Sequence, residues 1–179
     1  MTHLPTERRG FLAAAAGLAL LSALPAVRAQ GRGMSPVVGV PPAPTLALPD
    51  MDGKIIDLAR YRGKLVLVNF WATWCPPCRT EFPSLGRVRK LFKSTEFEVI
   101  AVNVGEDMET VFSFAATPAF PVLFDRDALA MARWQIMGLP TTLVVDRQGR
   151  LALRAVGGRE FDDPVIVAQL RELIRQGRT

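Results

Sequence analysis

Histidine is almost missing from this sequence. His3, at the extreme N-terminus, is the only one among 179 residues, which excludes any chemistry that needs an imidazole in the folded body. Cysteine is nearly as scarce: the chain has two, Cys75 and Cys78, too close together to build a long-range disulfide framework. A structural zinc site needs four ligands, and these two thiols cannot supply them within one chain.

A strong charge of either sign is also lacking. The formal net charge is +5, and 22% of the residues are charged against 49% hydrophobic. Lys and Arg form no run interleaved with aromatic residues, so we expect no nucleic-acid partner. The composition is that of an ordinary globular protein rather than a disordered or multi-domain chain, and we expect no cofactor.

The hydrophobic excess is concentrated near the start of the chain. An Arg8-Arg9 pair precedes an apolar run from Phe11 to Leu24, and small residues follow up to Ala29. This order is typical of an export signal, and a run of about 21 Å as a helix is too short for a hydrocarbon core of roughly 30 Å. We predict that residues 1–29 are a signal cleaved near Ala29 and that the protein is periplasmic. The paired arginines resemble the twin-arginine export motif, but general secretion stays open.

The remaining chain is predicted to hold one domain. Residues 30–44 are rich in proline and glycine and are expected to form an extended linker before a domain at 45–179. An Asp/Gly-containing turn at 50–53 predicts a β-hairpin between 45–48 and 54–58.

Beyond the hairpin, apolar runs of strand length alternate with segments of helical spacing. We expect strands at 65–70, 97–104, 121–124, 141–145 and 151–156, and helices at 79–93, 109–116, 128–134 and 164–176. The alternation predicts an α/β sandwich with parallel pairing near the centre of the sheet and an antiparallel hairpin at its end.

The Cys75-Pro76-Pro77-Cys78 motif stands where a buried strand passes into a helix. As a structural bridge it closes a loop of four residues, worth about 1.9 kcal/mol, against about 4.7 kcal/mol for a hundred-residue loop. The pair is therefore better placed for redox chemistry than for stabilising the fold. Binding of Cu(I) by the two thiolates, as in a copper chaperone, is the alternative from another functional class.

Redox chemistry assigns different roles to the two thiols. At a helix N-terminus, unpaired N–H groups and the helix dipole favour the thiolate, so Cys75 is predicted to be the nucleophile. Cys78, one turn inside the helix, is expected to resolve the mixed disulfide. Neither proline supplies an N–H, and we predict that the helix begins at Pro77. A thiolate with few donors favours a reductant, although a disulfide donor remains an alternative.

The segment from Val68 to Arg79 resembles the active-site segment of thioredoxin-fold proteins, and more closely that of the exported TlpA/ResA-like thiol-disulfide oxidoreductases. A second segment, 138–146, is similar to the one that carries this family's cis-proline. The resemblance implies that Pro140 is cis and lies beside Cys75.

A third match, at 102–106, implies that Glu106 lies near the disulfide and shuttles a proton. Thioredoxin has a buried acid where this chain has Asn69, so if an internal acid is used at all, Glu106 is the remaining candidate. Substrate docking is assigned to residues that flank the cysteines and the cis-proline: Trp74, Pro76, Pro77 and Leu139.

The resemblance implies a thioredoxin-like sandwich with a central mixed sheet, an N-terminal β-hairpin and an inserted βα unit, because Cys78 and Pro140 are 62 positions apart. Peroxiredoxins share this fold, but their Pro-x-x-x-Thr-x-x-Cys pattern is absent. The implied partners are disulfide-bearing exported proteins, such as apocytochrome c or copper-site assembly proteins, and a membrane thiol reductant of the DsbD/CcdA type. We expect a monomer.

Overall fold

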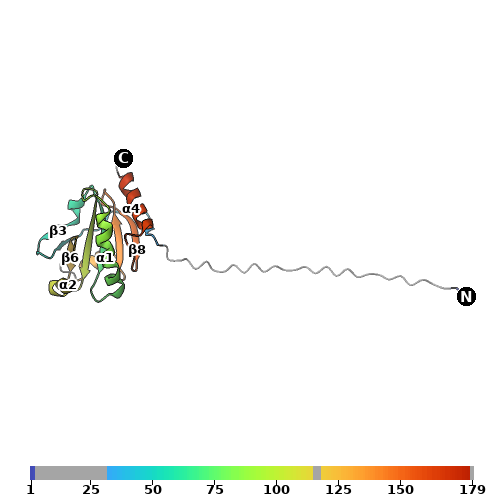
Figure 1. Ribbon diagram of the computed structural model, residues 1–179, viewed down its shortest axis with the longest axis horizontal. Helices are drawn as coiled ribbons and strands as arrows, with labels where there is room; N and C mark the ends of the chain where they lie inside the picture. The colour runs from blue at the N-terminus through green and yellow to red at the C-terminus, as the bar shows by residue number, and fades with distance from the viewer. Residues whose placement is uncertain (3–31, 115–117, 178–179) are drawn as a thin grey trace.

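The computed structural model describes residues 1–2, 32–114 and 118–177, so the predicted export signal lies, from residue 3 onward, outside the described residues. The described domain is a central sheet with helices packed on it (Figure 1). The helices and strands in chain order are β1 (Ser35–Pro36), β2 (Ala47–Pro49), β3 (Ile55–Asp57), the 3₁₀ helix η1 (Leu58–Tyr61), β4 (Leu65–Trp71), α1 (Pro76–Lys90), β5 (Phe97–Val104), α2 (Met108–Phe114), β6 (Val122–Asp125), α3 (Leu129–Arg133), β7 (Thr141–Val145), β8 (Leu151–Val156) and α4 (Pro164–Gln176).

The sheet is mixed, as predicted. Its strand order is β1-β8-β7-β4-β5-β6, in which β4, β5 and β6 run parallel while β7 and β8 form an antiparallel hairpin beside β4. The predicted N-terminal hairpin is the separate pair β2–β3. Because β4, β5 and β6 are parallel, the loops that follow their carboxyl ends all emerge at one edge of the sheet.

Strand β4 explains why the sheet has a core on each face. All seven of its residues are buried, and successive side chains point to opposite faces. One face carries Leu65, Leu67 and Trp71 into a cluster shared with α1 and α4, whereas Val66, Val68 and Phe70 enter a second cluster shared with α3. A continuous apolar run of this kind is typical of a central strand.

The segment predicted to be an extended linker lies along the domain. Ser35 and Pro36 pair with β8 as the edge strand β1, and Pro42 forms an isolated bridge with Arg150. Met34 is buried, and the side chain of Gln169 on α4 binds both its N–H, at 2.9 Å, and its carbonyl, at 2.8 Å. The chain from residue 32 onward is therefore attached to β8 and α4.

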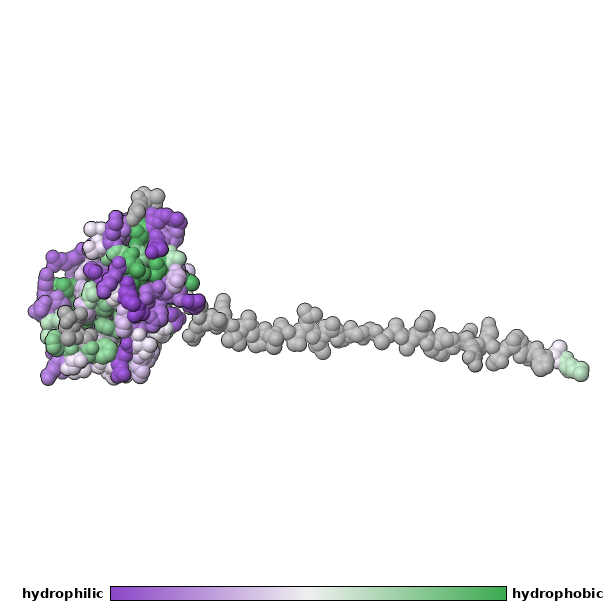
Figure 2. All heavy atoms as spheres, viewed as in Figure 1, coloured by the Kyte–Doolittle hydropathy of each residue, from purple (hydrophilic) through white to green (hydrophobic). Residues whose placement is uncertain are grey.

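Apolar side chains reach the surface over α2, at the lower left of the face shown in Figure 2. Met108, Phe112 and Phe114 are exposed there, and the Phe114 ring packs on Trp71 of β4. None of the helices in the described ranges is both long and apolar enough to cross a bilayer.

Candidate active site

The two cysteines lie where the chain leaves β4 and enters α1. Cys75 is the N-cap of α1 and is joined to Cys78 by a disulfide, with Cα atoms 5.3 Å apart. The helix begins at Pro76, so the predicted start at Pro77 was wrong by one residue. Pro76 fits the first helical position because that position needs no N–H donor and its φ is already helical.

Both prolines reduce the number of donors at this helix end. Pro76 and Pro77 occupy the first two helical positions, so among the first three only Cys78 retains a backbone N–H. The next N–H, that of Arg79, is bonded to the Cys75 carbonyl at 3.2 Å. The Cys75 sulfur therefore lies at a helix N-terminus with few free amides.

Both cysteines are buried in the oxidised form, Cys78 more completely than Cys75. Cys78 is fully buried at 0%, and Cys75 is only 4% exposed in this oxidised form. Of the predicted docking residues, Trp74 is 67% exposed, Pro76 and Pro77 are exposed, and Leu139 is half-buried against the core that contains both cysteines.

The peptide bond between Leu139 and Pro140 is cis, as the resemblance implied. Thr141, the first residue of β7, lies opposite Phe70 in the antiparallel ladder with β4. The cis-proline therefore enters β7 at the edge from which the 72–75 loop leaves β4. Met137, which the sequence did not single out, lies just before this turn and is 90% exposed.

Glu106 follows β5 at the same edge and holds the cysteine loop. Its carboxylate accepts hydrogen bonds from the backbone N–H of Thr73, at 2.8 Å, from the Thr73 hydroxyl and from Asn103 Nδ2, at 2.6 Å. Thr73 is two residues before Cys75, so these contacts fix the approach of the chain to the nucleophile. The sequence pointed correctly to an acid near the loop.

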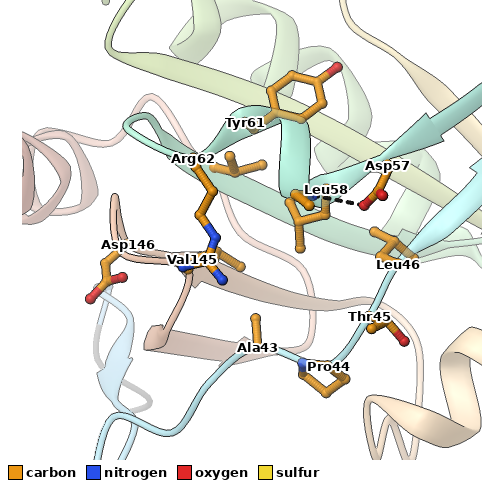
Figure 3. Close-up of a pocket in the computed structure, with 13 residues that line it drawn as sticks. Ala43, Pro44, Thr45, Leu46, Asp57, Leu58, Tyr61, Arg62, Val145 and Asp146 are labelled. Carbon is orange, nitrogen blue, oxygen red and sulfur yellow. Dashed lines mark hydrogen bonds between the residues drawn. The ribbon is translucent and has the colours of Figure 1, made fainter.

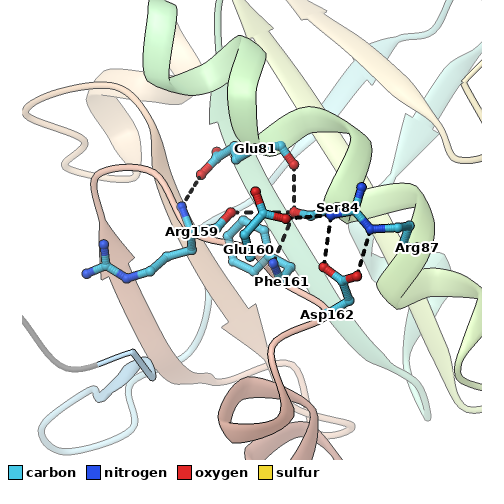
Figure 4. Close-up of polar contacts among 7 residues, drawn as sticks. All are labelled: Glu81, Ser84, Arg87, Arg159, Glu160, Phe161 and Asp162. Atoms are coloured by element: carbon cyan, nitrogen blue, oxygen red, sulfur yellow. Dashed lines mark hydrogen bonds and ion pairs between the residues drawn. The ribbon is translucent and has the colours of Figure 1, made fainter.

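A second acid, Glu81, was missed. It lies one turn beyond Cys78 on the buried side of α1 and is only 2% exposed. Its carboxylate accepts a hydrogen bond from Asn69 Nδ2, at 2.7 Å. It also accepts one from the Arg159 N–H, at 3.0 Å (Figure 4). The expectation that Glu106 is the remaining internal acid was wrong, because the helix supplies a deeper one to Asn69.

Burial raises the pKa of Glu81 from 4.5 to about 7, against the lowering effect of its two hydrogen bonds. The group can therefore exchange a proton near neutral pH. A depression of about 360 Å³ beside it, lined by Pro77, Thr80, Glu81 and residues 158–160, connects the acid to solvent. The signal in the sequence was an acidic residue three positions after Cys78, on the same helical face as Leu85 and Val88.

Another pocket lies at the opposite end of the sheet, between the 43–46 segment, η1 and the turn after β7 (Figure 3). It contains Arg62 and Asp57, whose carboxylate caps η1 through the Ala59 N–H. Its volume of about 100 Å³ is far below the 300–1,000 Å³ of typical small-molecule sites. It includes none of the predicted site residues.

Within the described residues, no group of three or more His, Cys, Asp or Glu side chains is placed to hold a metal ion.

Comparison with known proteins agrees with this geometry. Residues 41–154 match the AhpC/TSA family. The chain belongs to that family. It is 37% identical to the thiol-disulfide oxidoreductase ResA of Bacillus subtilis over 139 residues, and this alignment covers 76% of each chain. A putative thiol:disulfide interchange protein DsbE from Chlorobium tepidum superposes with a TM-score of 0.66 at 31% identity, over 78% of this chain and 96% of that one.

A third relative is the pneumococcal exposed lipoprotein thioredoxin Etrx1, with a TM-score of 0.63 at 28% identity, over 72% of this chain and 99% of that one. This AhpC/TSA-family chain has the thioredoxin-like fold and is a thiol-disulfide oxidoreductase. Its sequence contains the Cys75-Pro76-Pro77-Cys78 motif and lacks the peroxiredoxin pattern Pro-x-x-x-Thr-x-x-Cys.

Proposed function

We propose that this protein is an exported protein-disulfide reductase in which Cys75 attacks the partner and Cys78 resolves the mixed disulfide. The observation that carries the proposal is the placement of the pair across the first turn of α1, with Cys75 at the helix tip and Cys78 sealed beneath it. A thiolate at the tip is stabilised by the helix dipole, whereas a sealed thiol reacts only within the molecule.

In the first step the Cys75 thiolate attacks one sulfur of a partner disulfide. A bond forms between Cys75 and that sulfur, the partner's S–S bond breaks, and the second partner sulfur leaves as a thiolate that takes a proton from solvent. Trp74, next to the nucleophile, and Leu139, before the cis-proline, supply apolar contact for the docked partner.

In the second step Cys78 must lose its proton before it can attack the Cys75 sulfur. Glu81 lies one turn further along the same helix, and its pKa of about 7 lets the carboxylate accept that proton at neutral pH. The Cys75–Cys78 disulfide then forms, and the first partner sulfur leaves as a thiolate. Two electrons have passed to the partner, and the protein ends oxidised.

The scarcity of amide donors at the Cys75 sulfur supports reduction rather than donation of disulfides. Strongly oxidising proteins of this chemistry stabilise their reduced thiolate, which makes the disulfide a better oxidant. With Pro76 and Pro77 in the first turn, that stabilisation is weak. A reductant in an oxidising compartment needs a supply of electrons, and we assign it to a membrane thiol reductant of the DsbD/CcdA type.

The N-terminal segment and the relatives support an assignment of location and partners. We assign residues 1–29 to a signal that directs the domain to the periplasm, in keeping with the exposed location of the pneumococcal lipoprotein. The partners are exported proteins with an accessible disulfide, with apocytochrome c and copper-site assembly proteins as candidates. The domain is taken to act as a monomer.

The decisive experiment traps the mixed disulfide. A Cys78→Ser variant should remain covalently joined to its partners through Cys75, and non-reducing gels followed by mass spectrometry should identify the linked cysteines. The matched control is Cys75→Ser, which keeps the same number of thiols but should trap nothing, because Cys78 is fully buried.

Equal trapping by both variants would contradict the assigned roles. The wild-type protein should also reduce insulin disulfides with a dithiol as electron source. Tight binding of Cu(I) by the reduced protein without any dithiol turnover would overturn the proposal in favour of a copper-binding module.

A further inference from the structure

The segment that joins β8 to α4 lies along α1 and contacts the active site at three points. The Gly157 N–H donates to the carbonyl of the cis-proline Pro140, at 2.9 Å. Gly158 packs against Pro77, where an added Cβ would lie 3.4 Å from the proline Cβ and carbonyl oxygen. The Arg159 N–H donates to Glu81, at 3.0 Å. One short segment, 157–162, therefore links the cis-proline, the cysteine motif and the buried acid.

Ser84, one turn beyond Glu81, fixes the middle of this segment (Figure 4). Its hydroxyl donates to the Glu81 carbonyl, at 2.6 Å, and accepts the Phe161 N–H, at 3.0 Å. Ser84 and Phe161 are both 0% exposed. The amide two residues after Arg159 is thus held by the helix that carries the acid.

Arg87, one turn further, fixes the end of the segment. Its Nε donates to Asp162, at 2.6 Å, and its Nη2 donates to both Asp162 and Glu160. The two acids flank Phe161, and the contact with Arg87 lowers the pKa of Asp162. Three side chains at successive turns of α1, Glu81, Ser84 and Arg87, therefore bind the segment in order.

We propose that Ser84 and Arg87 are positioning residues, which act through the 157–162 segment to keep the Arg159 N–H on the Glu81 carboxylate and so set the proton affinity of the acid that serves Cys78. This inference rests on the proposed function, and it adds residues outside the cysteine and cis-proline motifs. The charged groups that face Glu81 are Arg159, which lowers its pKa, and Glu160, which raises it. Both belong to the segment that Ser84 and Arg87 hold.

The direct test follows the Glu81 carboxyl by ¹³C NMR during a pH titration of the full-length protein. In Ser84→Ala the Phe161 N–H loses its acceptor, the segment moves away and the Arg159 donor leaves the carboxylate. The pKa of Glu81 should then rise by about 0.5 to 1 pH unit, the effect of losing one hydrogen bond to the charged form. Arg87→Ala should shift it in the same direction by less, because Phe161 still anchors the segment.

Arg89→Ala is the matched control. It also removes one positive charge from α1 and breaks an ion pair, but the partner of Arg89 among the described residues is Glu98 of β5 and not a residue of the 157–162 segment. The Glu81 titration should be unchanged in this variant even if the protein is less stable. Amide exchange of Arg159 and Phe161 should be faster in Ser84→Ala and Arg87→Ala than in Arg89→Ala.

The acid limb of the pH profile for insulin reduction should move upward with the Glu81 titration in Ser84→Ala. A role that is only structural would lower the rate at every pH without moving this limb. Titrations and pH profiles identical to wild type in both Ser84→Ala and Arg87→Ala would overturn the inference. If Ser84→Ala does not fold, the Glu81 titration and the pH profile of Arg87→Ala decide alone, because the Arg87 side chain is half-exposed. A wild-type protein that reduces no disulfide would instead overturn the proposed function, whatever the titrations show.

Discussion

Two acidic side chains reach the cysteine region from different elements, and water access separates their chemistry. Glu106 is half-buried after β5 and accepts three hydrogen bonds, all from Thr73 and Asn103. Glu81 is buried on α1, beside a depression that opens to solvent, and accepts two, from Asn69 and Arg159. Burial of Glu81 raises its pKa, so Glu81 is suited to proton transfer, and Glu106 is suited to holding the loop before Cys75.

The raised pKa of Glu81 predicts a pH-dependent stability. Between pH 4.5 and about 7 the folded protein holds a proton on Glu81 that the unfolded chain has released, so the free energy of unfolding falls as pH rises through this window. Between pH 5 and pH 8 the loss is about 2 to 3 kcal/mol. Glu81→Gln, which mimics the neutral acid, should lose this slope.

Urea unfolding of the oxidised wild-type protein and of Glu81→Gln, each at pH 5 and at pH 8, measures how the free energy of unfolding depends on pH. The variant should be close to wild type at pH 5 and more stable at pH 8. Glu106→Gln is the control at the same edge of the sheet. If the free energy of unfolding changed with pH in the same way in wild type and in Glu81→Gln, Glu81 would ionise in the folded state as easily as in water.

From the sequence, a site residue could be predicted only where a local motif marks it. Cys75 and Cys78 stand in a motif that carries its own signal, whereas the cis-proline was implied only by the resemblance of segment 138–146 to a known family. Glu81 could be recognised only by its position on the buried face of α1, and its partner Arg159 lies 78 positions away. A tertiary hydrogen bond of that separation leaves no local pattern in the sequence.

At the scale of elements, hydrophobic periodicity predicted most of the sheet and its hairpins. The strands 97–104, 141–145 and 151–156 and the helix 164–176 have their predicted bounds. Errors arose at both ends of α1, which begins at Pro76 rather than Pro77 and ends at Lys90 rather than at residue 93. Within the predicted extended segment 30–44, the structure adds the short edge strand β1. A two-residue strand exists only because it pairs with β8, and it is too short to show a hydrophobic periodicity in the sequence.

Attachment of this N-terminal segment to α4 depends on one side chain. Gln169 satisfies both backbone groups of the buried Met34. In Gln169→Ala the N–H and the carbonyl of Met34 lose their hydrogen-bond partners while they stay buried away from bulk water. This loss should cost about 1 to 3 kcal/mol of unfolding free energy. Urea unfolding measures the loss, and amide exchange at Met34 should accelerate.

Arg171→Ala, at an exposed position on the same helix, is the comparison variant. Its stability should stay within about 0.5 kcal/mol of wild type. If Gln169→Ala behaved in the same way, the contact with Met34 would contribute nothing net, and the segment would be held by β1 and the bridge at Pro42 instead.

At the scale of the whole molecule, the fold and the dithiol are energetically separable. The sheet carries an apolar cluster on each face, and the cysteines belong to only one of them. A domain of this size buries roughly 68 to 70% of the surface of its unfolded chain, enough to fold without a covalent link. The proposed reductase cycle requires this separation, because the protein must remain folded in both redox states.

Thermal unfolding with and without a reductant tests that separation. The Cys75–Cys78 bridge spans a sequence separation of 3, and so short a loop constrains the unfolded chain by about 1.9 kcal/mol. Reduction should therefore lower the Tm by about 4 to 8 °C and leave a single cooperative transition, since 1 kcal/mol corresponds to about 2 to 4 °C for a domain of this size. The Cys75→Ser, Cys78→Ser double variant should match the reduced protein and be insensitive to the reductant.

A loss of cooperative unfolding on reduction would show that the Cys75–Cys78 bridge is needed for folding. A protein that depends on this bridge for folding could not use the same sulfurs to reduce a partner.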